Sequence, residues 1–138
     1  MPPPTIWLVR AALVHLLVGT ALGALLLVTK ADLGMPPWVA RTWPLHGEMM
    51  LLGWMVQMAM GVAYWILPKH TQRPVRGVAA PVVMAALLIN AGVAGAGLGQ
   101  LVGRAGLVVA GRLAELAAVL LFASNAWPRI KEFGRERD

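Results

Sequence analysis

Cysteine is absent from this chain of 138 residues, and charged side chains make up only 13% of it. Without cysteine the protein cannot form disulfides, iron–sulfur clusters, thiolate zinc sites or covalent c-type haem links. An average soluble domain contains about 25% charged residues. Because 59% of the residues are apolar, so short a chain cannot bury them in a water-soluble core. The composition therefore excludes an ordinary soluble enzyme, and it also excludes a disordered protein.

Long apolar segments fill most of the chain. A helix needs about 20 apolar residues to cross a bilayer core about 30 Å thick, and four segments reach that length: residues 6–29, 43–67, 78–99 and 105–127. They leave no room for a soluble domain, and none of them alternates apolar with polar residues as a β-barrel strand would. We predict one all-α domain over residues 1–138, an integral membrane four-helix bundle.

The formal net charge of +6 comes from lysine and arginine residues that flank the apolar segments. Because they do not line a polar face, we expect no nucleic-acid partner. They are concentrated in the linker at 69–77 and in the C-terminal tail, and the positive-inside bias therefore predicts cytoplasmic termini in a bacterial inner membrane.

Trp38 and Trp43 suit a membrane interface. Two GxxxG pairs predict close helix packing: Gly19 with Gly23, and Gly95 with Gly99.

Polar side chains inside the apolar segments are the candidates for function, because such groups are costly in a bilayer. They are Arg10, His15, His46, Glu48, Gln57, Asn90, Arg112 and Glu115. We expect Arg10 to extend to the membrane surface and Asn90 to hydrogen-bond a neighbouring helix. His46 stands near the outer end of its segment, directly before Gly47. A neutral imidazole is a good iron ligand, and a glycine beside it would let a flat macrocycle approach the helix.

The stretch from His46 to Pro68 resembles the second transmembrane helix of the large subunit of haem–copper oxidases and nitric oxide reductases. In that superfamily a histidine near the outer end of this helix is an axial ligand of the low-spin haem. An apolar run, a glycine, an aromatic residue and a proline follow it. The corresponding residues here are His46, Gly61, Tyr64 and Pro68. His46, Gly47 and Met50 resemble the pattern of the oxidases. Gly53-Trp54 and Tyr64-Trp65 are more similar to the pattern of the nitric oxide reductases.

The resemblance implies a haem b site on His46 and no oxidase active centre. The full-length relatives have many more helices, and the histidines that bind copper there have no counterpart in this chain. In its length the chain resembles the short stand-alone members of this superfamily, which are similar to oxidase subunit I. We expect the haem propionates to meet arginines on the outer side, namely Arg41, Arg104 and Arg112. For Arg112 the alternative is an ion pair with Glu115, three residues further on the same helix face.

The second axial ligand stays open. His15 lies about 20 Å from the outer end of its helix, whereas His46 lies about 5 Å deep, so the two do not suit one iron. The iron could be five-coordinate, or His46 of a second subunit could complete the site across a two-fold axis. A methionine could also bind it, and Met35, Met49 and Met50 are near in sequence.

These features predict a haem b membrane protein, a homodimer or higher homo-oligomer that transfers electrons with a redox partner or binds nitric oxide or oxygen. One alternative is a Cu(I) site made by Met35, His46, Met49 and Met50. Another is a cofactor-free structural subunit of a respiratory complex. No hydroxyl residue has a base and an orienting acid beside it in the sequence, and so any enzymatic activity would be of the oxidoreductase type.

Overall fold

The computed structural model describes residues 1–68 and 78–130, and all regular structure in these ranges is helical. The elements are α1 (Pro3–Lys30), η1 (Val39–Thr42), α2 (Trp43–Glu48), η2 (Met49–Val56), α3 (Gln57–Ile66), α4 (Ala79–Leu101), α5 (Ala105–Ala126) and η3 (Trp127–Arg129). In the described part of the chain, four helical segments are long and apolar enough to cross a membrane. This confirms the all-helical class and the number of candidate spans.

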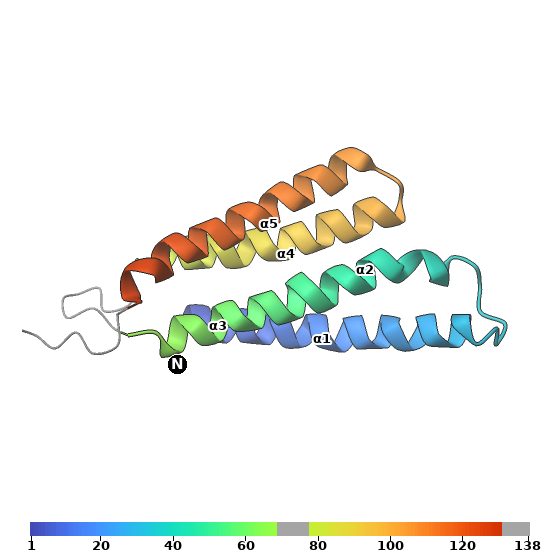
Figure 1. Ribbon diagram of the computed structural model, residues 1–138, viewed down its shortest axis with the longest axis horizontal. Coiled ribbons are helices and arrows are strands. Elements are labelled where there is room, and N and C mark those ends of the chain that lie inside the picture. Colours follow the sequence, from blue (N-terminus) through green and yellow to red (C-terminus); the bar gives the residue numbers. More distant parts are fainter. Residues whose placement is uncertain (69–77, 131–138) are drawn as a thin grey trace, which may run out of the picture.

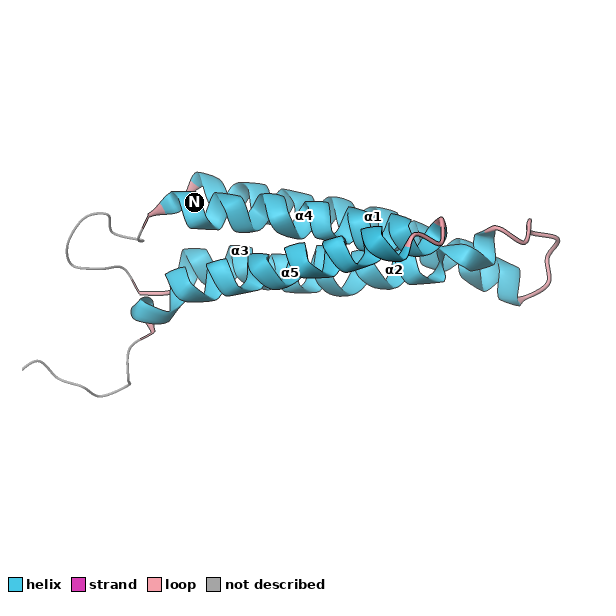
Figure 2. Ribbon diagram, turned by 90° about the horizontal axis from the view of Figure 1, so that it is seen from above, coloured by secondary structure: helices cyan, strands magenta, loops and turns pink. Residues whose placement is uncertain are grey.

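The helices form two antiparallel pairs, which lie one above the other in Figure 1. One pair consists of α1 and the continuous rod α2–η2–α3, and the other consists of α4 and α5 (Figures 1 and 2). A small apolar core joins the pairs at the end where α3 stops; it contains Leu8, Met60, Tyr64, Val82, Ala85, Ile89 and Ala118. The N-terminus lies at the same end of the bundle.

The second span is not one regular α-helix. The eight residues Met49–Val56 form a π-helix between α2 and α3, a feature that apolar periodicity did not predict. A π-helix bonds each N–H to the carbonyl five residues earlier and is often associated with functional sites. Here it contains Gly53, on whose backbone the ring of His15 lies. The first span begins at Pro3 rather than residue 6, since proline is tolerated in the first turn of a helix.

Glycines bring the helices into close contact, as the GxxxG pairs predicted. A Cβ atom at Gly95 would lie 3.4 Å from the Cα of Gly111, and one at Gly99 would lie 2.8 Å from the backbone nitrogen of Val108. These contacts hold α4 against α5 along the halves that are next to the turn between them. In the other pair, Gly19 and Gly23 of α1 lie against side chains of the second span.

The lateral surface of the bundle is apolar, and tryptophans mark its two ends. Leu17, Leu27 and Leu113 are all more than 60% exposed, which is typical of helices that face lipid. Exposed tryptophans lie at one end (Trp38 and Trp43) and at the other (Trp7, Trp65 and Trp127). The rise from Trp43 to Trp65 is roughly 33 Å, which matches a bilayer core of about 30 Å.

Arg129 ties the last helix to the second span. It is buried, and its guanidinium donates hydrogen bonds to the carbonyls of Tyr64, Leu67 and Pro68 at 2.8–3.0 Å. Its guanidinium carbon also lies 5.2 Å from the centre of the Tyr64 ring. The carbonyls at the C-terminus of α3 have no partners within their own helix, and Arg129 supplies them with donors.

Candidate functional site

His46 is held in one orientation by the backbone of α1. Its Nδ1 lies 2.7 Å from the carbonyl oxygen of Gly19, so this nitrogen must carry the proton and donate. In the described part of the chain no residue bonds Nε2, which is therefore left as an acceptor. A metal-binding histidine commonly has this arrangement, because the bond from its other nitrogen fixes the tautomer and the ring plane.

Gly23 makes room for the imidazole. A Cβ atom at this position would lie only 2.8 Å from Cε1 of His46. One helical turn away, a Cβ at Gly19 would lie 2.8 Å from Sδ of Met50. The glycine pair of α1 thus receives a histidine and a methionine from the second span, and this packing positions both side chains.

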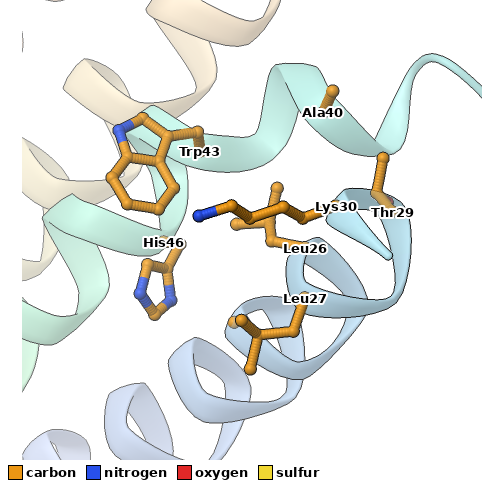
Figure 3. A pocket seen from close by; sticks show the side chains of 8 residues that line it. Leu26, Leu27, Thr29, Lys30, Ala40, Trp43 and His46 are labelled. Carbon is orange, nitrogen blue, oxygen red and sulfur yellow. The ribbon is translucent and has the colours of Figure 1, made fainter. Parts of the chain in front are cut away.

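His46 lines a cavity of about 550 Å³ between α1 and the start of the second span. Figure 3 shows the Lys30 ammonium pointing into this cavity between the rings of Trp43 and His46. The remaining lining is mostly apolar and comes from Gly23, Leu26, Leu27, Thr29 and Ala40. Its volume lies within the usual range of small-molecule cavities, about 300–1,000 Å³.

The other residues predicted for the haem site are not brought to this cavity. Gly47, Met50 and Arg112 line a second cavity, of about 470 Å³. Arg41 in η1 and Arg104 before α5 are exposed and line neither cavity. The structure therefore divides the predicted set in two, because His46 projects toward α1 whereas Gly47 is on the side of the helix that borders the second cavity.

Arg112 is paired with two carboxylates rather than one. Its Nη2 lies 2.5 Å from Oε1 of Glu48, and its Nη1 lies 2.9 Å from Oε2 of Glu48. Nη1 also lies 3.1 Å from Oε2 of Glu115, which is the pair that their spacing of three residues indicated. Gln100 donates a further bond of 3.2 Å to Glu48. This network joins α2, α4 and α5 through buried carboxylates.

His15 occupies a different level of the bundle from His46. A Cβ at Gly53 would lie 2.6 Å from Cγ of His15, whereas His46 meets α1 at Gly19 and Gly23. His15 lies about 12 Å along the axis of α1 from Gly23, the residue on which His46 packs. The two histidines therefore do not face one site. His15 lies beside the fully buried Gln57. In the described part of the chain, neither His15 Nδ1 nor the amide of Gln57 has a hydrogen-bond partner of good geometry.

The prediction that Asn90 hydrogen-bonds a neighbouring helix is wrong. Its Nδ2 donates to the carbonyl of Ala86 in its own helix at 2.6 Å, and not to a neighbouring helix as expected. The spacing of four residues allows this return bond, because the side chain of a helical residue reaches the carbonyl one turn earlier.

The methionines named as possible ligands do not line the cavity of His46. Met49 and Met50 pack on Gly19, and Met35 is in the loop before η1. Within residues 1–68 and 78–130, no three histidine, aspartate or glutamate side chains lie close enough to hold a metal ion. His70 lies outside the described residues.

Comparison of the chain with protein-family models, with curated proteins and with solved structures finds no match. The interpretation of the site therefore rests on the residues themselves.

Sequence reasoning did not assign two of the important side chains to their sites. Glu48 was identified only as a polar residue in a span, yet it is the main partner of Arg112. Both residues lie about 8–10 Å from the N-terminal ends of their spans, and opposite charges at one depth could have indicated the pair. Lys30 lies just beyond the predicted first segment, yet it is the last residue of α1 and lines the same cavity as His46.

Proposed function

We propose that this protein binds haem b in the membrane through His46. The observation that carries the proposal is the 2.7 Å contact between His46 Nδ1 and the Gly19 carbonyl. It fixes the ring with Nε2 as the free acceptor, which is the atom that an axial histidine offers to iron. The resemblance of residues 46–68 to an oxidase haem-binding helix points to the same side chain.

The cavity beside His46 suits an amphiphilic macrocycle in its chemistry. Leu26 and Leu27 offer apolar surface, and Trp43 offers an aromatic face. Lys30 is the cation that projects into this space, so we assign a propionate to Lys30 in place of Arg112. Arg41 directly follows the lining residue Ala40 and is the natural partner for a second propionate.

When bound, haem b supplies an iron that changes oxidation state and takes diatomic ligands. In the described part of the chain, His46 is the histidine that lines this cavity, so a second iron ligand would come either from a second copy of the protein or be a gas. The first arrangement favours electron transfer and the second favours binding of nitric oxide or oxygen.

The proposal places the bundle in a bacterial inner membrane with both termini in the cytoplasm. The support is the positive-inside bias of the sequence together with the apolar lateral surface and the two tryptophan belts. Because the chain has no cysteine, single cysteines introduced at Gly34 and at the N-terminus would test the orientation by labelling from outside intact cells.

The test is the absorption spectrum of detergent-purified protein from haem-replete cells, oxidised and reduced, with and without carbon monoxide. We expect a Soret band in the wild type, its loss in His46→Ala, and its retention in the matched variant His15→Ala. A further variant, Lys30→Gln, should weaken haem affinity several-fold without changing the position of the band.

A colourless wild type, or a His46→Ala protein with normal haem content, would overturn the assignment. Reduced bands that ignore carbon monoxide would identify a six-coordinate iron and electron transfer. A band that shifts with carbon monoxide would identify an open iron face and gas binding.

A further inference from the structure

The second cavity is bordered by the second span and by Arg112 of α5, and His46 does not line it. It is lined by Pro44, Gly47, Glu48, Met50, Leu51, Trp54, Met55 and Arg112, and its volume is about 470 Å³. Leu51 and Met55 at its border are 56% and 54% exposed. The cavity therefore opens on the lateral face of the bundle, from which a molecule dissolved in the membrane can enter.

Arg112 presents unused hydrogen-bond donors at this cavity. A guanidinium carries five N–H groups, and three of them bond Glu48 and Glu115. No residue in the described part of the chain bonds Nε or the remaining N–H of Nη2. The Arg112 side chain is also 49% exposed, although it lies well inside an apolar helix. N–H groups of a half-exposed guanidinium that lack an acceptor are costly at such a depth.

The charges around Arg112 select a neutral ligand. Glu48 and Glu115 are 6% and 5% exposed and both bond the guanidinium, so the three groups together carry no net positive charge. An anionic headgroup would gain no attraction from this cluster. A carbonyl oxygen is an uncharged acceptor, and it would satisfy the free N–H groups without adding charge.

We propose that this second cavity binds a neutral, lipophilic carbonyl compound whose oxygen accepts hydrogen bonds from Arg112. Quinones and the ester groups of lipids share this chemistry. Trp54 and the methionines supply the apolar and aromatic surface for the body of the ligand, and Gly47 leaves space against the backbone, since a Cβ there meets nothing within 4 Å. The site does not depend on haem at His46.

The experiment uses the full-length protein prepared without haem in a maltoside detergent, which contains no ester groups. Binding of a short-chain alkyl benzoquinone is measured by equilibrium dialysis, and retained phospholipid is measured by native mass spectrometry. Gly47→Leu fills the cavity and leaves the ionic network in place. Gly106→Leu is its matched control, because a Cβ at Gly106 also meets nothing within 4 Å and Gly106 lines neither cavity.

We expect saturable quinone binding that Gly47→Leu weakens at least tenfold and Gly106→Leu leaves unchanged. Arg112→Lys keeps the positive charge but lacks the Nε–H, and it should weaken binding several-fold. Retention of ester phospholipid that depends on Gly47, without quinone binding, would support the site and identify the lipid as the source of the carbonyl. The proposal is overturned if neither molecule binds, or if binding is equal in Gly47→Leu and Gly106→Leu.

Discussion

Glu48 and Arg112 bond one another across the bundle through both carboxylate oxygens, at 2.5 and 2.9 Å. They are 64 positions apart in the sequence, and they connect the two helix pairs near the end of the bundle where α2 and α5 begin. Glu115 provides only one bond to the same guanidinium, and its Oε1 is buried without a hydrogen-bond partner in the described part of the chain. The two carboxylates therefore differ in what they contribute.

Glu48→Gln should destabilise the protein by about 1–3 kcal/mol, because it removes charge-assisted bonds from a buried site. Glu115→Gln should cost less than about 1 kcal/mol, since it removes one such bond together with a partly unsatisfied buried charge. Both free energies of unfolding can be measured by titration with sodium dodecyl sulfate in mixed micelles. Equal losses in the two variants would contradict the unequal roles seen in the structure.

Arg129→Gln should lower the free energy of unfolding by about 2–4 kcal/mol. The substitution removes the bonds to the carbonyls at the end of α3 and the contact with the ring of Tyr64. The control is Arg10→Gln, because Arg10 is exposed on α1 and should change stability by less than about 0.5 kcal/mol. The same unfolding titration measures both variants, and a loss in Arg10→Gln as large as in Arg129→Gln would refute this assignment.

Gly111→Ala should separate α4 from α5. A Cβ atom at Gly111 would collide with the backbone nitrogen of Ala96, and backbone cannot move aside as the end of a side chain can. Overpacking of this kind costs about 1–3 kcal/mol. Gly106→Ala, in the same helix but in open space, should instead stabilise the protein by about 0.5–1 kcal/mol. A Gly111→Ala protein at least as stable as the wild type would show that the helices do not pack at this point.

The sequence alone determined the class of this protein. Runs of about 20 apolar residues leave an α-helix as the structure that satisfies every backbone group internally, and the described spans follow those runs closely. Gly95 and Gly99 predicted close helix packing, because only small side chains let two helix backbones approach each other. The spacing of Arg112 and Glu115 likewise indicated their contact.

Only the tertiary structure decided which polar groups meet. Helical period relates His46 to Gly47 and Met50, but it does not say which neighbour each one faces, and the structure sends them to different cavities. Three features depend on contacts between segments that are distant in sequence. They are the pairing of Glu48 with Arg112, the hydrogen bonds from Arg129 to the carbonyls at the end of α3, and the shared cavity of Lys30 and His46. The apolar pattern is nearly uniform around α1, α4 and α5, so it does not fix the rotation of these helices. Glycine contacts and a few buried polar bonds fix it instead.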